Sequence, residues 1–202
     1  MPLNNTINMQ AIVNQHFDEH ANAVKQSKQA LKSTISTGAE LIIQSLLNKG
    51  KLLCCGNGGS SGDASHLASE LINRFELERS ALPAIALSTD SAVITSIAND
   101  YQYEHIFARQ IEALGLENDC LIAFSTSGNS KNVINAIHAA HKKNMSVLAI
   151  TGKSGGEIRQ TLTNKDIEIC VPSEKTSRIQ EVHLITIHIL CDLIDNSLFN
   201  NS

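Results

Sequence analysis

The sequence has no long basic run, no C-x-x-C cysteine pair and no leader with a basic start and an apolar segment. Its formal net charge of −4 argues against binding nucleic acid through the phosphate backbone. The first ten residues, MPLNNTINMQ, do not resemble a signal peptide. We also expect no apolar run to approach the length of a membrane span. These absences predict a cytoplasmic protein that binds neither membranes nor nucleic acid directly.

Cysteine usage and chain length point to an ordinary intracellular domain. None of the five cysteines lies in a C-x-x-C pair, and most lie in apolar runs, which is typical of buried thiols in a reducing compartment. With 202 residues, 42% of them hydrophobic, the chain can fill one sizeable core. The cysteines are Cys54, Cys55, Cys120, Cys170 and Cys191.

The first fifty residues predict two helices. Residues 10–36 contain neither glycine nor proline, and their apolar residues recur every three or four positions. Residues 37–50 continue as a second helix that ends at Gly50. We therefore assign residues 1–48 to an N-terminal helical arm used for oligomerisation and residues 49–202 to the main domain.

The remainder of the chain alternates between strand-like and helix-like segments. Short, nearly continuous apolar strands that alternate with helices predict a parallel sheet covered on both faces. The predicted fold is thus α/β, doubly wound and five-stranded, ending in an apolar helix over residues 178–199 that we expect to be buried. The five strand-like runs are 51–55, 83–87, 120–125, 146–151 and 167–171.

Two of these strands lead into loops rich in hydrogen-bond donors. The first loop is GNGGSSGD at 56–63, and the second is STSGNS at 125–130. Ligands of such sheets bind at the carboxyl ends of the strands, where backbone amides and helix N-termini favour an anion. Gly, Ser and Asn also simply make turns and cap helices. Two such loops on strands that we expect to be neighbours favour a phosphate site.

The glycine loop does not match the nucleotide-binding motifs. A P-loop needs a lysine after its glycines, and none follows Gly62. The dinucleotide pattern G-x-G-x-x-G fails because its third glycine would fall at Ser61. A nucleotide is therefore the weaker interpretation of this loop.

Two segments carry side chains that can bind a metal. His66 and Glu70 share one face of a predicted helix, which is ligand geometry for zinc but also the spacing of a simple surface contact. In the last helix Gln180, His183 and His188 interrupt an apolar surface, where a histidine is commonly a hydrogen-bonded core residue. Gln180 and His188 are about 12 Å apart by helical rise. The spacing permits a metal site without establishing one.

Five stretches, taken together, resemble the sugar isomerase (SIS) family, and within it the branch that acts on seven-carbon sugar phosphates. They lie in order at 55–75, 82–101, 125–137, 150–157 and 178–199. The resemblance implies a cytoplasmic homotetramer with a flavodoxin-like sheet. It also implies an aldose–ketose isomerase that converts sedoheptulose 7-phosphate into D-glycero-D-manno-heptose 7-phosphate, the first committed step towards the heptose of the lipopolysaccharide core.

The resemblance also implies roles for individual residues. Glu70 corresponds to the base and His188 to the acid of an enediol isomerisation assisted by one zinc ion per subunit. Ser177 stands where some relatives have an aspartate, so no acid–base role is assigned to it. The metal ligands correspond to His66, Glu70, Gln180 and His188. The substrate contacts correspond to Asn57, Gly58, Gly59, Asn99, Asp100, Ser125, Thr126, Ser127, Ser130 and Gln180.

Two other functions stay open at this point. A close branch of the same family is not catalytic and binds the bacterial replication initiator to promote its assembly at the origin. Residues 72–87 and 191–199 resemble that branch as much as the enzymes. That branch lacks parts of the ligand set, so the presence of Glu70 and His188 favours the enzyme. A sugar-phosphate-sensing regulator is the third possibility, but no DNA-binding segment accompanies the domain.

Overall fold

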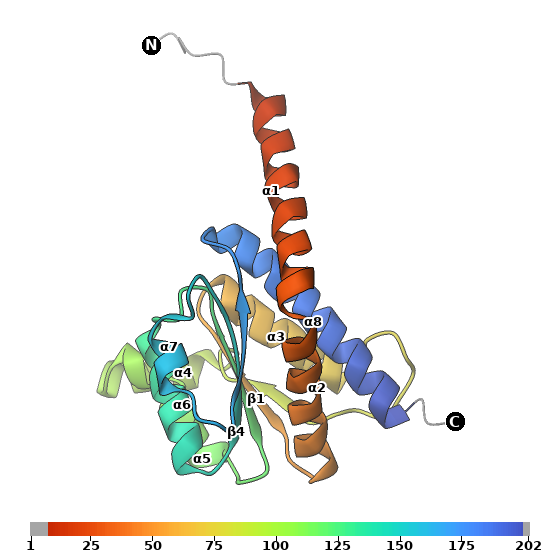
Figure 1. Ribbon diagram of the computed structural model, residues 1–202. Helices are drawn as coiled ribbons and strands as arrows, with labels where there is room; N and C mark the ends of the chain where they lie inside the picture. The colour runs from red at the N-terminus through yellow and green to blue at the C-terminus, as the bar shows by residue number, and fades with distance from the viewer. Residues whose placement is uncertain (1–7, 200–202) are drawn as a thin grey trace.

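The structure is a computed structural model that describes residues 8–199 and contains one five-stranded sheet (Figure 1). All strand pairs are parallel, in the order β2-β1-β3-β4-β5. Every predicted strand is present, because each apolar run is short and bounded by turn residues. The strands are β1 (Leu52–Cys55), β2 (Ala84–Ala86), β3 (Cys120–Ser125), β4 (Ser146–Gly152) and β5 (Ile167–Val171).

Helices cover both faces of the sheet, as predicted for a doubly wound fold. One face packs against α2, α3 and α8, and the other against α4, α5, α6 and α7 (Figure 1). The helices are α1 (Met9–Ala30), α2 (Lys32–Leu47), α3 (Gly59–Ile72), α4 (Ser91–Asp100), α5 (Ala108–Leu114), α6 (Lys131–Lys142), α7 (Gly156–Thr161) and α8 (Thr176–Phe199), with a short 3-10 turn, η1 (Tyr103–His105).

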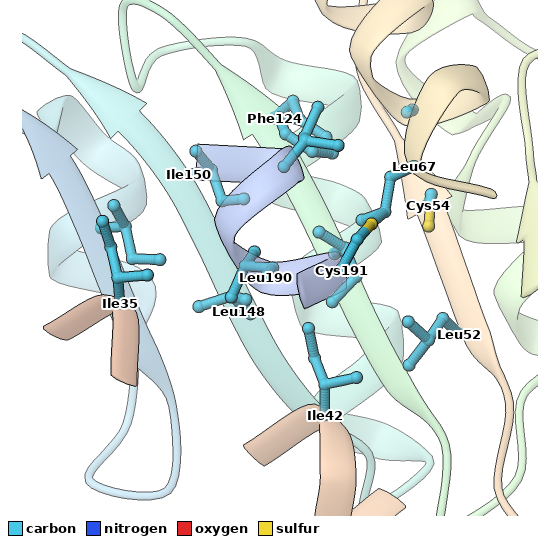
Figure 2. Packing of buried hydrophobic residues seen from close by; sticks show 14 of the residues in the cluster. Ile35, Ile42, Leu52, Cys54, Leu67, Phe124, Leu148, Ile150, Leu190 and Cys191 are labelled. Carbon is cyan, nitrogen blue, oxygen red and sulfur yellow. The ribbon is translucent and has the colours of Figure 1, made fainter. Parts of the chain in front are cut away.

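The strands are apolar along their whole length because they are buried on both faces. Leu52 faces the cluster beneath α2, α3 and α8, whereas the next residue, Leu53, faces the cluster beneath the other helices. Successive side chains of a strand point to opposite faces, so each strand supplies both clusters. Figure 2 shows the first cluster, in which Ile42 of α2, Leu67 of α3 and Leu190 of α8 gather over the strands.

The two N-terminal helices differ from their predicted bounds. The break falls at Leu31 (φ −109°, ψ −4°), not after residue 36. Apolar periodicity runs through Leu31 without glycine or proline, so no local signal marks this break. α2 lies directly on the sheet: a Cβ added at Gly38 would lie 3.0 Å from a methyl group of Leu148. Of the predicted arm 1–48, α1 extends away from the sheet (Figure 1), while residues 1–7 lie outside the described residues.

The end of α2 also differs from the prediction that Gly50 stops it. The helix ends at Leu47, and Lys49, with φ 63°, takes the left-handed conformation that turns the chain. Gly50 matters for a different reason, since a Cβ there would lie 2.1 Å from the carbonyl oxygen of Asn118. Close approach to another loop, not backbone freedom, requires glycine at this position.

The long C-terminal helix corrects the expectation about apolar runs. α8 has 24 residues, and an 18-residue window within it has a mean hydropathy of 1.3, so the helix is long and apolar enough to cross a membrane by length and composition alone. The core helix of a soluble protein meets the same criterion, and 44% of this window is buried inside the domain. α8 packs against α2 and α3, so the structure accounts for its apolar character.

Candidate active site

The two donor-rich loops meet at the point where the strand order reverses. β1 pairs with β3, with Leu53 opposite Leu121, so the loops that follow these strands leave the same edge of the sheet side by side. This confirms that the two strands are neighbours. In doubly wound sheets ligands bind at this switch point. The first loop turns into α3 at Gly58, whose φ of 55° favours glycine.

A pair of asparagines joins the two loops. Asn57 and Asn132 each donate a side-chain hydrogen bond of 2.8 Å to the other, across the gap between the first loop and the start of α6. The hydroxyl of Tyr103 donates to the same Asn57 oxygen at 3.0 Å. Neither Asn132 nor Tyr103 is among the predicted site residues. The only sequence signal for Asn132 is its position just after the serine loop.

The second loop brings hydroxyl groups together at the N-terminus of α6. The Oγ atoms of Ser125 and Ser130 are 3.0 Å apart, and Ser125 is 3% exposed. The Oγ of Ser127 accepts a hydrogen bond from the backbone N–H of Asn129, while Thr126 and Ser127 are half-buried. The loop turns at Gly128, which has a φ of 68°. The predicted serine and threonine donors are thus gathered in one short turn.

The predicted metal and proton-transfer residues meet where α3 and α8 pack together. The Nε2 atoms of His66 and His188 are 3.0 Å apart, and their rings are edge to face. The Nε2 of His66 is also 3.6 Å from Oε1 of Glu70 on the same helix. The side chains of His66 and Glu70 are 37% and 21% exposed, so a ligand can reach them.

Gln180 lies at the other end of the same helix pair. A Cβ added at Gly59 would lie 2.2 Å from Nε2 of Gln180, so this amide rests on the first residue of α3. Gln180 therefore lies at the first loop, whereas His188, eight residues later, meets His66. The two helices run in the same direction, with Gln180 beside the loop and His188 beside Glu70's turn.

The donor atoms on α3 and α8 suit zinc in kind. Two ligands of a tetrahedral zinc ion are about 3.3 Å apart, close to the 3.0 Å between the two histidine nitrogens. Among residues 8–199, however, no three His, Cys, Asp or Glu side chains form a group that could hold a metal ion. His66, Glu70, Gln180 and His188 therefore stay a predicted ligand set.

Asn99 and Asp100 lie apart from these groups on the exposed end of α4. The side chain of Asn99 donates to Asp100 at 2.8 Å. Asp100 lines a surface cavity of about 490 Å³ between α4 and α5. Their roles as substrate contacts stay predictions.

His183 is a core residue, as the alternative interpretation of the last helix allowed. It is fully buried, and its Nε2 lies 2.9 Å from the carbonyl oxygen of Thr151, to which it donates. Its Nδ1 faces Oδ2 of Asp63 at 3.8 Å. His183 thus links α8 to β4 and α3.

All five cysteines are free thiols, and the four in or beside the two core clusters are buried. Burial raises the pKa of Cys55, Cys120 and Cys191 to about 12 and that of Cys54 well above its usual value. These thiols stay protonated at neutral pH, so they are not nucleophiles.

The comparisons with known proteins first define the class. The sequence profile of the SIS domain matches residues 15–152, which includes both loops, α3 and the five-stranded sheet as far as β4. A doubly wound sheet with two donor-rich loops at its switch point agrees with that class. The protein is a SIS-domain protein.

The most similar relatives narrow this class. A phosphoheptose isomerase of Alkalilimnicola ehrlichii is 54% identical over 188 residues, 93% of this chain and 96% of that protein. Solved phosphoheptose isomerases from Francisella tularensis and Neisseria gonorrhoeae have TM-scores of 0.92 and 0.89 at 42% and 44% identity. They cover 94% and 93% of this chain, and this chain covers 100% and 99% of theirs. This chain belongs to the phosphoheptose isomerase family, and it is a sugar-phosphate isomerase.

Proposed function

We propose that this enzyme converts sedoheptulose 7-phosphate into D-glycero-D-manno-heptose 7-phosphate in the cytoplasm. This would be the first committed step towards the heptose of the lipopolysaccharide core. The observation that carries the proposal is the meeting of His66, Glu70 and His188 on two helices that begin at the donor-rich edge of the sheet. Relatives above 50% identity that are named phosphoheptose isomerases support the seven-carbon substrate.

The serine loop would hold the phosphate of the substrate. Ser125 and Ser130 offer hydroxyl groups 3.0 Å apart, and the positive end of the α6 dipole lies beside them. The phosphate is on C7, at the opposite end of the sugar from the reacting C1 and C2. Anchoring it at the loop would fix the register of the sugar, so that C1 and C2 lie at the α3–α8 pair.

Glu70 and His188 would carry the protons. The carboxylate of Glu70 would take a proton from C1 of the ketose while His188 donates one to the C2 oxygen, which yields an enediol. Glu70 would then return a proton to C2 while His188 accepts the proton of the C1 hydroxyl, which leaves the aldehyde. The two groups end the cycle in their starting protonation states, so no external acid or base is consumed.

A zinc ion held by His66, Glu70, Gln180 and His188 would polarise the carbonyl and stabilise negative charge on the adjacent oxygens when bound. Glu70 and His188 would give up their place as ligands when the sugar binds, which would free them to carry protons. The nitrogen and oxygen donors of these side chains support this choice of metal. The 3.0 Å contact between the imidazoles brings two of the donors to one point.

We also propose that the enzyme assembles as a homotetramer through α1 and the outer face of α8. Phe17 on α1 is 71% exposed, and Met9, Ile12 and Val13 on the same helix are exposed as well, so α1 presents an apolar surface. A groove of about 580 Å³ lies between α1, α2 and α8. The lining is mainly apolar and includes Val24, Leu31, Ile35, Val182, Ile189 and Leu193.

The deciding experiment is an isomerisation assay with sedoheptulose 7-phosphate, run with added zinc and again after chelation. The proposal predicts turnover with zinc and little after chelation, restored by adding zinc back. Turnover that chelation leaves unchanged would overturn the zinc assignment alone. A folded protein without turnover in either sample would overturn the substrate, and binding to the replication initiator would then be the function to test.

A further inference from the structure

The connector between α3 and β2, residues 73–83, contains a buried arginine that is not one of the proposed ligands, substrate contacts or proton-transfer groups. The side chain of Arg79 is 0% exposed, which is rare for a charged group. Its Nε donates to Oδ1 of Asp195 at 2.6 Å, and the side chain of Asp195 is 4% exposed. The ring of Phe199, at the end of α8, lies 5.7 Å from the guanidinium carbon. Such a closed arrangement holds the arginine in one position.

The same guanidinium binds the end of α3. Its Nη2 donates to the carbonyl oxygen of Glu70 at 3.0 Å, and its Nη1 donates to that of Leu71 at 2.9 Å. The last carbonyl groups of a helix have no partner within the helix, and a cation there is favourable. Arg79 thus caps the turn that carries Glu70 and fixes the backbone from which that carboxylate projects.

Asp195, the partner of Arg79 on α8, lies on the same face of that helix as His188. Asp195 follows His188 by seven residues, which is close to two helical turns and returns to the same face. Arg79 therefore connects the turn under Glu70 to the face of α8 that presents His188. A second residue of the connector acts on His188 directly. The ring of Phe75 stacks on the imidazole at 5.5 Å between centroids, with 26° between the planes.

We propose that the connector 73–83 sets the mutual orientation of the two proton-transfer groups, with Arg79 and Phe75 as positioning residues. Arg79 acts on Glu70 through the backbone of α3, and Phe75 acts on the ring plane of His188. This inference rests on the proposed function, because it assigns proton transfer to Glu70 and His188.

The main test removes both charges of the buried pair in Arg79→Met/Asp195→Leu. Removing both partners leaves no buried charge unpaired, so the protein is expected to fold. The expected result is a kcat lower by about tenfold or more, with KM within about twofold and a melting temperature within a few degrees of the parent. A kcat at the parent level would overturn the proposal, because a purely structural pair would affect melting and leave kcat unchanged.

The matched control lies in the same connector. Arg74 and Glu78 form a pair of 3.2 Å, but their side chains are 47% and 87% exposed. Arg74→Met/Glu78→Gln removes an equivalent interaction at the surface and should leave kcat unchanged. Equal losses in both double variants would overturn a specific role for Arg79. If the buried double variant does not fold, Arg79→Lys replaces it, since lysine keeps the charge but cannot bind Asp195 and both carbonyl groups together.

A measurement without turnover separates this inference from the proposed substrate. The imidazole NMR signals of His188 should shift in Phe75→Leu and Arg79→Lys, and they should stay in place in Arg74→Met. Unchanged His188 signals in Arg79→Lys, which keeps the stacked ring of Phe75, would overturn the positioning role; Phe75→Leu shifts the signals in any case, because it removes the ring current of the stacked ring. A parent enzyme that does not isomerise sedoheptulose 7-phosphate would instead overturn the proposed function, and the NMR result would still decide the inference.

Discussion

The Nε2 atoms of His66 and His188 lie 3.0 Å apart, although 122 positions separate the two residues in the chain. His66 is in the second turn of α3, and His188 is in the middle of α8. Both helices lie on the same face of the sheet, and because Gly59 meets Gln180 nearer the start of each helix, they run in the same direction. His66 has Glu70 beside it on the same helix. His188 comes close to this pair only because α8 packs against α3.

Replacing the proposed base should stop the reaction without unfolding the enzyme. Glu70→Gln keeps the shape of the side chain, but the amide cannot accept a proton, so we expect kcat to fall by about 100-fold or more. The measurement is kcat together with a thermal melt. The control is Glu78→Gln, because that carboxylate is 87% exposed and should be replaceable without effect. Parent-level turnover in Glu70→Gln would rule out Glu70 as the base.

Zinc content should depend on His66. We expect His66→Ala to bind clearly less zinc per subunit than the parent, because removal of one nitrogen leaves an incomplete ligand set. Elemental analysis of dialysed protein measures this directly. His138→Ala serves as the control, since His138 is exposed on α6, far from the α3–α8 pair. Equal zinc in all three proteins would contradict the predicted ligands.

A methyl group at Gly59 should impair the enzyme with little effect on its stability. The added Cβ would lie 2.2 Å from Nε2 of Gln180, and the flexible end of that side chain would have to move away. We expect Gly59→Ala to lower kcat/KM by about tenfold and to melt near the parent temperature. Gly62→Ala is the control in the same helix, because nothing lies within 4 Å of a Cβ there. Equal activities of the two variants would show that the position of Gln180 does not matter.

Stability should decrease with rising pH above about 8.5. Burial raises the pKa of Cys55, Cys120 and Cys191 to about 12, whereas an unfolded thiol ionises near about 8.5. Between these values only the unfolded chain loses the thiol proton, so it is favoured as pH rises. The free energy of unfolding should fall by up to about 1.4 kcal/mol per pH unit for each such thiol. Below about pH 8.5 the thiols are protonated in both the folded and the unfolded chain, so they add no pH dependence to the free energy of unfolding.

Urea denaturation at pH 8, 9 and 10 measures this slope. Cys120→Ala should reduce the slope of the unfolding free energy against pH by up to about 1.4 kcal/mol per pH unit, the contribution of one thiol. This holds whatever the variant does to stability at pH 8. Cys170→Ala is the matched variant, because that thiol is only half-buried. A slope that neither variant alters would contradict the assignment to buried thiols.

Much of the fold follows from local patterns in the sequence. Each strand is a short apolar run bounded by turn residues, and alternation with helical segments implies parallel pairing. Two donor-rich loops can share one ligand only if the strands before them are neighbours. The structure has β1 next to β3, as expected. Helix ends are less predictable. The break at Leu31 has no glycine or proline to mark it. Its position depends on tertiary packing, because α2 lies on the sheet while α1 extends away from it.

The sequence by itself determined the strands, the two loops and the residue types available for proton transfer and metal binding. These depend on neighbours in the chain: periodicity, turn residues and spacing along one helix. Only the tertiary structure decided that His188 meets His66, that Gln180 rests on Gly59 and that Arg79 joins the end of α3 to Asp195. These contacts arise from how helices pack on one face of the sheet. That packing depends on buried shape summed over many residues, which no local pattern encodes.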